Sequence, residues 1–445
     1  MNIQISEHFS YRKLIKFTIP TITMMIFTSL YGVVDGIFVS NCVGSDSFAA
    51  VNLIMPVLMM LGSVGFMIGT GGSALVSMTL GQGKKERANE YFSMLIAFVI
   101  VTGLVLTGVG LIFMRKIAML LGAEGAILED CVLYGNVLLL ANVAFMLQNC
   151  FQSFLVVAER PQMGLKISVA AGVTNMVLDF LFIYVFRWGV VGAAAATGIS
   201  QIVGGGIPLL YFARKNSSPL HLVRFHFDGH ALLKSCSNGS SEMLTNLSMS
   251  LVNMLYNIQL MKFAGADGVA AYGIIMYVSF IFSGTYLGYS IGIAPIVGYH
   301  YGADNRRELC SLLKKSLILI GTVAVVLTVA AELLSGILAG IFVSYDKELL
   351  AMTVTAIQIY SLSYFVSGFN IFGSAFFTAL NNGAVSALIS FLRTLLFQVV
   401  MIFLLPAVWG LNGIWFAVVA AELLALIVTV ICFVANQKKY HYWGK

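Results

Sequence analysis

The chain has 445 residues, of which 59% are hydrophobic and only 10% are charged, whereas a soluble domain carries roughly 25% charged residues. This composition excludes a soluble enzyme, and the formal net charge of +6 reflects orientation in a membrane rather than affinity for nucleic acid. Apolar runs recur along the chain, and each is long enough to cross a bilayer as a helix. We therefore predict an all-α polytopic membrane protein.

The predicted membrane-spanning helices fall into two groups of six. In chain order they are 14–40, 49–80, 90–113, 127–156, 163–186 and 190–213, then 241–263, 269–300, 312–334, 350–379, 384–406 and 411–435. We accordingly divide the chain into an N-terminal lobe (1–213), a polar cytoplasmic linker (214–240) and a C-terminal lobe (241–445). Little chain remains outside the spans, so we expect no appended catalytic domain and no cofactor.

The second half of the chain repeats the first. A shift of 221 positions, with no gap, superimposes landmarks of both halves: Gly71 on Gly292, Gly81 on Gly302, Asn149 on Asn370, and Trp188-Gly189 on Trp409-Gly410. Because each half has an even number of spans, the two repeats run in parallel, related by an axis along the membrane normal. This duplication is typical of transporters that bind their substrate between two halves.

Lys and Arg predict the orientation. They concentrate near the N-terminus, in the linker, and in the turns that follow the second and eighth spans, as at Lys84, Lys85, Arg306 and Arg307. Basic residues favour the cytoplasmic side. We therefore expect both termini in the cytoplasm of a bacterial cell, with the protein in the inner membrane.

Polar side chains gather at one depth of the first half. Asp35 lies five residues from the outer end of its predicted span, and Asp179 and Thr197 each lie seven residues from theirs, with Asn175 one helical turn before Asp179. A carboxylate inside a membrane costs several kcal/mol unless it is protonated, paired or ion-bound. This layer suits a monovalent cation such as Na⁺, or one or two protons on a coupled acid pair. The alternative is that these groups only hydrogen-bond the helices together.

The repeat provides an internal comparison for this layer. Positions 35, 175, 179 and 197 correspond to Tyr256, Leu396, Val400 and Val418 in the second half. The acidic layer therefore belongs to the first half alone, which favours a functional role over a general structural one.

The second half carries different polar and aromatic residues. Glu242, Asn246, Asn253 and Asn257 form one stripe at helical spacing, while Arg393 and Glu422 lie near the middle of their spans, where they can pair or contact a substrate. Glu242 falls near the cytoplasmic end of its predicted span, where a solvated position is an equal alternative. We assign a substrate cavity to these residues together with Tyr256, Met276, Tyr277, Phe280 and Asn370. Aromatic and Met side chains suit bulky cationic guests.

The whole chain resembles the multidrug and toxic compound extrusion (MATE) family. The resemblance rests on the two six-helix halves, on the basic turns after Gly81 and Gly302, and on Pro20 placed fifteen residues before Asp35. In that family the residues corresponding to Asp35, Asn175, Asp179 and Thr197 form a cation site, and the helix bend at the proline responds to it. The chain departs from some members because its 350–379 span has no acidic residue. We therefore expect no second-half sodium site.

From these features we predict a secondary antiporter, not an enzyme, that exports drug-like and often cationic compounds by alternating access in exchange for H⁺ or, less favoured, Na⁺. The resemblance implies small organic molecules as substrates, and we expect a monomer in contact with membrane lipid but not with nucleic acid. The alternative is a flippase for a lipid-linked precursor in the same broader superfamily. That function requires a strongly basic cavity, whereas Arg393 is the one basic residue deep in a predicted span.

Overall fold

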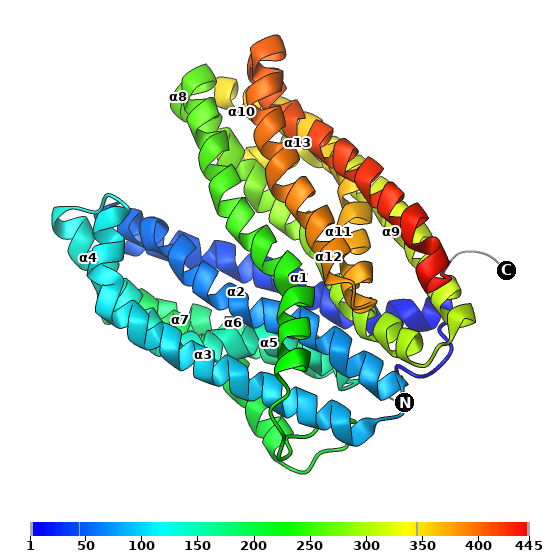
Figure 1. Ribbon diagram of the computed structural model, residues 1–445. Helices are drawn as coiled ribbons and strands as arrows, with labels where there is room; N and C mark the ends of the chain where they lie inside the picture. The colour runs from blue at the N-terminus through cyan, green and yellow to red at the C-terminus, as the bar shows by residue number, and fades with distance from the viewer. Residues whose placement is uncertain (1–2, 44, 344–345, 443–445) are drawn as a thin grey trace.

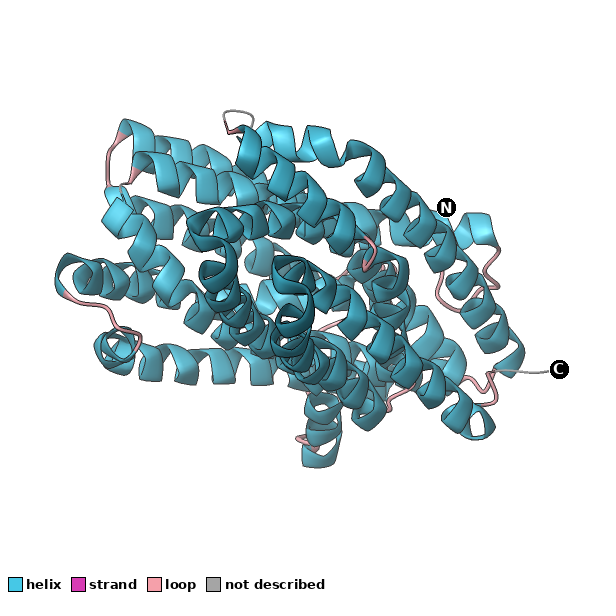
Figure 2. Cartoon of the chain, turned by 90° about the horizontal axis from the view of Figure 1, so that it is seen from above, coloured by secondary structure: helices cyan, strands magenta, loops and turns pink. Residues whose placement is uncertain are grey.

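The computed structural model describes residues 3–43, 45–343 and 346–442, and this part of the chain is helical, with connecting loops that are short except for the segment 214–228 (Figure 2). The first half contains α1 (Tyr11–Cys42), α2 (Ser45–Gly81), α3 (Lys85–Leu120), α4 (Gly125–Leu140), α5 (Asn142–Val157), α6 (Pro161–Asp179), the π-helical turn η1 (Phe180–Val185) and α7 (Gly189–Ala213). The second half contains α8 (Gly229–Gly302), α9 (Arg306–Val343), α10 (Lys347–Ser361), α11 (Tyr364–Ala379), α12 (Gly383–Phe391), the π-helical turn η2 (Leu392–Leu396) and α13 (Phe397–Tyr440).

The predicted twelve spans are confirmed. Two of them are pairs of helices bent at a short break, α4 with α5 by 57° and α10 with α11 by 47°. Two continuous stretches each contain two spans, because α8 turns at Gly265 (φ 63°) and α13 turns at Gly410 (φ 58°). Glycine adopts positive φ without a steric penalty from Cβ. Gly189, the repeat counterpart of Gly410, has nearly the same φ of 57°.

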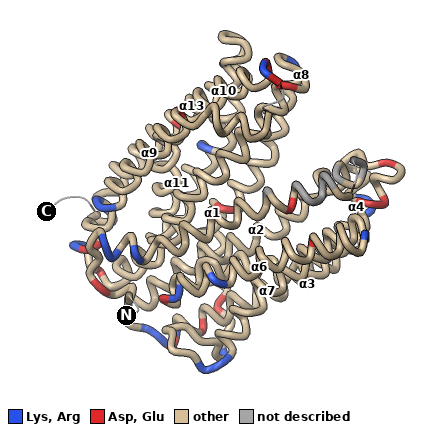
Figure 3. The backbone as a smooth tube through the Cα atoms, turned by 180° about the vertical axis from the view of Figure 1, so that it is seen from behind, with Lys and Arg blue, Asp and Glu red and all other residues tan. Residues whose placement is uncertain are grey.

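The two halves form separate lobes arranged as a V (Figure 1). The lobes meet near both chain termini and diverge toward α4 in one half and toward α8 and α10 in the other. Lys and Arg gather at the end of the molecule that holds the termini (Figure 3). The duplicated sequence thus produces two similar bundles that touch at one end.

Glycines allow the lobes to approach at that end. A Cβ atom on Gly81 would lie 2.0 Å from the carbonyl oxygen of Tyr299, and one on Gly302 would lie 2.0 Å from that of Met78. These two contacts exchange under the 221-residue shift, since Met78 corresponds to Tyr299. The glycines aligned from sequence are therefore reciprocal contacts across a pseudo-twofold axis, where backbone packs on backbone.

The first helix of the second half begins earlier than the hydropathy pattern predicts. Asp228 caps α8 by accepting a hydrogen bond from the backbone N–H of Ala231 (3.0 Å), so residues 229–240 of the predicted linker are helical. This helical segment is polar because it packs on protein rather than on lipid: Ser235 and Gly239 are buried against α2. Hydropathy alone does not detect such a segment.

The N-terminal segment that precedes α1 contacts both lobes. The backbone N–H of Ile5 donates to Glu159 of the first lobe (2.9 Å), and the backbone N–H of Phe9 donates to Glu308 of the second (2.9 Å). The His8 ring contacts the other carboxylate oxygen of Glu308, and Lys315 donates to the carbonyl oxygen of Phe9. Both Ile5 and Phe9 are buried. The segment therefore joins the lobes where they meet.

Replacement of Glu308 by Ala is expected to lower stability, because it leaves the buried N–H of Phe9 without an acceptor. Such a loss costs about 1–3 kcal/mol. Thermal unfolding in detergent measures the effect. Glu348→Ala is the matched control, since Glu348 also lies in the first turn of a helix but is exposed. Equal unfolding temperatures for the two variants would show that the N-terminal segment adds nothing.

Candidate cation site and central cavity

The four polar residues predicted at one depth of the first lobe lie together. Asp35 comes from α1, Asn175 and Asp179 from α6, and Thr197 from α7. The Asp35 carboxyl lies within hydrogen-bonding reach of the side chains of Asp179 and Asn175. The amide of Asn175 in turn donates to the hydroxyl of Thr197 (3.4 Å). Asp179 is 0% exposed and Asn175 is 1% exposed.

Most of the oxygens of this cluster lack a hydrogen-bond donor among the described residues. Four buried atoms, Oδ1 of Asp35, Oδ1 of Asn175 and both carboxylate oxygens of Asp179, have no partner among the described residues. Two ionised carboxylates in contact repel each other, and burial makes unpaired charge costly. A shared proton or a bound monovalent cation supplies the missing positive partner. The geometry therefore fits either coupling ion.

Two tyrosines beside the acid pair escaped the sequence analysis. Tyr31 lies one turn before Asp35 on α1, a spacing that places both on one helix face. Tyr134 of α4 is 1% exposed and lies close enough to both acids for their charges to act on it. Helical spacing reveals the first, whereas no local pattern reveals the second.

A wide helical turn follows Asp179 directly. In η1 the backbone N–H of Phe186 donates to the carbonyl of Leu181, five residues earlier (2.8 Å). Single π-helical turns are rare in proteins as a whole, and those that occur are often found at functional sites. A second such turn, η2, contains Arg393 in the other lobe. Both wide turns therefore adjoin an intramembrane charge.

A central cavity of about 390 Å³ lies between the lobes. It is lined by α1, α2 and α5 of the first lobe and by α8, α10, α11, η2 and α13 of the second. Eight of the predicted cavity residues line it: Glu242, Asn246, Asn253, Tyr256, Met276, Phe280, Arg393 and Glu422. The sequence missed the contribution of the first lobe, which includes Met25 and Phe66.

Three predicted cavity residues do not line the cavity. Asn257 is exposed because the stripe from Glu242 drifts by roughly 60° over fifteen residues of an α-helix. Tyr277 is 40% exposed and stacks on Phe342, 6.0 Å between ring centres. Asn370 is fully buried behind the lining. Spacing predicted the right helices but not the rotation of each residue.

Arg393 and Glu422 form a partly buried ion pair. The Nε of Arg393 donates to both carboxylate oxygens of Glu422, at 2.8 and 3.0 Å. Asn370 donates from behind to Oε2 of Glu422 (2.8 Å), and Thr429 donates to the side-chain oxygen of Asn370 (2.9 Å). These contacts hold the Glu422 carboxylate against Arg393. An ion pair removed from water is stable only when its geometry is good and further hydrogen bonds satisfy its remaining polar atoms.

Glu242 lies deeper than its place in the sequence suggests. Since α8 begins at Gly229, Glu242 is about 20 Å along the helix rather than at its mouth. It lines the cavity, and no described residue donates a hydrogen bond to its carboxylate. Arg393 is near enough to attract it electrostatically, but Arg393 is hydrogen-bonded to Glu422.

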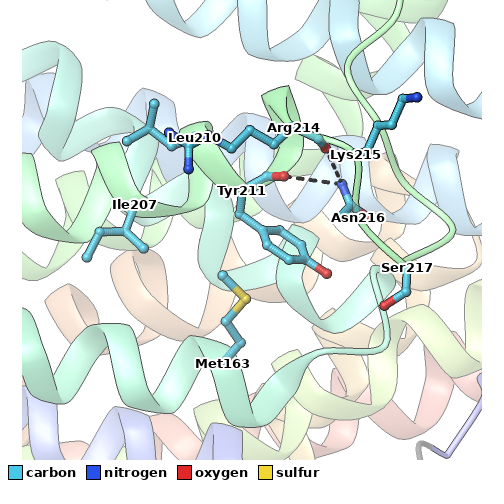
Figure 4. A pocket seen from close by; sticks show the side chains of 8 residues that line it. All are labelled: Met163, Ile207, Leu210, Tyr211, Arg214, Lys215, Asn216 and Ser217. Carbon is cyan, nitrogen blue, oxygen red and sulfur yellow. Dashed lines mark hydrogen bonds between the residues drawn. The ribbon is translucent and has the colours of Figure 1, made fainter.

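A larger groove lies on the outside of the first lobe. It measures about 760 Å³ and is lined by Met163 of α6, by the end of α7 and by the loop after it. Figure 4 shows Arg214 and Lys215 pointing in different directions, with Asn216 bonded to two carbonyls at the end of α7. None of the predicted site residues lines this groove, so the central cavity, which eight of them line, is the better candidate.

Two helical lobes, a charged cluster inside one of them and a cavity between them define a multi-pass membrane transporter. The MatE family model matches residues 20–181 and 243–404, once in each half. The chain therefore belongs to the MATE family of transporters, and the duplication is confirmed. Members of this family are transporters rather than enzymes.

Several known proteins are similar over almost the full length. The multidrug export protein MepA of Staphylococcus aureus (strain MSSA476) is 23% identical over 430 residues, covering 96% of this chain and 94% of the relative. A multidrug resistance MATE transporter in an outward-facing conformation matches with a TM-score of 0.91 at 24% identity, covering 97% and 98% of the two chains. A MATE structure in the straight conformation matches with a TM-score of 0.90 at 23% identity, with the same coverage.

Proposed function

We propose that this protein is an antiporter that exports drug-like organic cations in exchange for protons. The observation that carries the proposal is the contact between Asp35 and Asp179 inside the first lobe, where no described cationic side chain pairs with either carboxyl group and both oxygens of Asp179 have no hydrogen-bond partner among the described residues. A site that lacks a positive partner responds to the entry of a cation. The similarity to a multidrug export protein supports the transport of varied organic compounds.

The choice of coupling ion rests on the contact between the carboxyl groups. A proton bridges two carboxyl groups directly and needs no further ligand. Na⁺ fits the same oxygens, with Asn175 and Thr197 completing the set. We favour H⁺, with Na⁺ as the alternative.

The shape of the molecule supports alternating access. With basic residues on the cytoplasmic side, the termini and the contact between lobes face the cytoplasm, and the V opens outward. A similar MATE structure is described as outward-facing. A cation shifts the balance between the two states only by its differential affinity for them, and the acid pair provides that difference.

Pro20 connects the cation site to this movement. It lies within α1, about 22 Å along the helix from Asp35. Proline removes one backbone hydrogen bond and weakens the helix at that point. In the structure α1 is one continuous helix. We propose that protonation at Asp35 changes the bend at Pro20.

The charges of the cavity lining give less support to the alternative function, a flippase. A lipid-linked pyrophosphate requires several cations, whereas the basic side chain among the cavity-lining residues is Arg393. That cation is held by Glu422. The remaining charge of the lining is acidic, which suits a cationic guest.

Dye efflux from proteoliposomes tests the function. A pH gradient and a Na⁺ gradient are imposed separately, with the same fluorescent organic cation as cargo. We expect efflux that follows the pH gradient and is insensitive to Na⁺. Efflux that follows the Na⁺ gradient alone would mean that Na⁺, not H⁺, is the coupling ion. Efflux that follows neither gradient would contradict antiport.

A further inference from the structure

The central cavity contains an uneven set of charges. Among its lining residues the ionisable groups with charge are Glu242, Arg393 and Glu422. Arg393 and Glu422 neutralise each other at 2.8 Å. Within the described part of the chain, the carboxylate of Glu242 has no hydrogen-bonded counter-ion. The cavity therefore offers one negative charge to a guest.

Glu422 is not free to supply a second negative charge. Its side chain is 5% exposed, and Asn370, which is buried and does not line the cavity, donates to Oε2. Asn370 is itself anchored by Thr429. Rotation of Glu422 toward a guest would break these contacts and leave Arg393 unpaired and only 19% exposed. Such an uncompensated buried charge is strongly destabilising.

The remainder of the lining does not compensate a second positive charge. It consists mainly of apolar and aromatic side chains, with hydroxyl and amide groups that are dipoles rather than ions. Charges that lie against such an apolar surface interact more strongly than charges in bulk water, because the protein side screens them less. A guest with one positive charge is neutralised by Glu242, whereas a second positive charge meets no uncompensated anion, because Glu422 is already paired with Arg393.

We propose that the Arg393–Glu422 pair is the specificity-determining element of this cavity, restricting its guests to compounds with a single positive charge. The inference rests on the proposed export of organic cations and adds the number of charges that the cargo carries. Arg393 acts by withdrawing Glu422 from the guest, and Glu242 acts as the counter-ion.

The test compares two flat aromatic cations of similar size. The probes are 1-methyl-4-phenylpyridinium, with one charge, and methyl viologen, with two. Binding to the purified full-length protein is measured by calorimetry without any gradient, across neutral to mildly alkaline pH. The wild type is expected to prefer the monocation by about tenfold or more.

The variants form a charge series with matched controls. Arg393→Gln leaves two uncompensated carboxylates and is expected to improve binding of the dication relative to the monocation by about tenfold. Arg393→Gln combined with Glu422→Gln leaves Glu242 alone and should restore the preference of the wild type. Arg393→Lys keeps the charge and should also retain that preference. Glu242→Gln should weaken binding of the monocation.

The outcomes separate the inference from the proposed function. If the wild type prefers the dication, or if the single Arg393→Gln variant behaves like the double variant at every pH, the inference is wrong while cation binding stands. If the wild type binds neither probe, both the inference and the proposed export of organic cations fail. Thermal unfolding of each variant shows that the comparison is made on folded protein.

Discussion

Replacement of Asp35 or Asp179 by Asn is expected to lower efflux driven by a pH gradient by about tenfold or more. Each change keeps the shape of the side chain but supplies an amide donor to the remaining carboxylate, so a proton is no longer needed to hold the two groups together. The difference in cation affinity between the two conformations then disappears. Because a tenfold shift corresponds to about 1.4 kcal/mol, loss of even one such interaction lowers efflux by at least about tenfold.

Proteoliposome efflux measures this effect, and equilibrium binding of the cargo accompanies it. Binding should persist in both variants, because neither aspartate lines the central cavity. Glu332→Gln is the control, because it removes a carboxylate that lies in the other lobe, away from the acid pair, where it accepts a hydrogen bond from Ser361 (2.9 Å). Wild-type coupling in both aspartate variants would refute the proposed mechanism.

Replacement of Gly239 by Ala is expected to separate the lobes at the end that holds the termini. A Cβ atom there would lie 1.8 Å from the carbonyl oxygen of Met67 in α2, and both partners are backbone that cannot rotate away. Overpacking of this kind costs about 1–3 kcal/mol. If this cost applies only to the conformation in which the lobes touch at that end, the equilibrium between this conformation and the one in which they separate there shifts by roughly 5- to 150-fold.

Spin labels at the ends of α2 and α8 measure the separation of the lobes. The distance should lengthen in Gly239→Ala, and gradient-driven efflux should fall with it. Gly206→Ala is the matched control, since no atom lies within 4 Å of a Cβ at that glycine of α7. An unchanged distance together with full efflux in the Gly239 variant would show that this contact is not needed in the transport cycle.

The acid cluster illustrates what helical geometry makes predictable. In a membrane span each residue adds about 1.5 Å of depth, so Asp35, Asp179 and Thr197 are placed at one level by counting alone. Lipid offers no hydrogen-bond partners, which forces polar groups at the same depth toward one another. The structure brings the same residues together, with Asn175 between Asp35 and Thr197.

The second-lobe cavity illustrates where counting fails. Asn257 and Tyr277 lie on the predicted helices but rotate away from the cavity. Asn370 faces Glu422 instead of a guest. Depth does not determine which side of a helix meets a neighbour, because that depends on how the helices pack and not on the helix itself.

The amino-acid sequence by itself determined the class of the protein, the number of spans, their duplication and the level at which the acidic residues lie. All of these follow from transfer of side chains into lipid and from the rise of a helix, which are local properties. Tertiary structure alone decided that Tyr134 joins the acid pair, that Glu422 belongs to Arg393, and that Glu242 stands unpaired deep in the cavity. Those facts depend on distances between helices that are remote in sequence, and only packing establishes them.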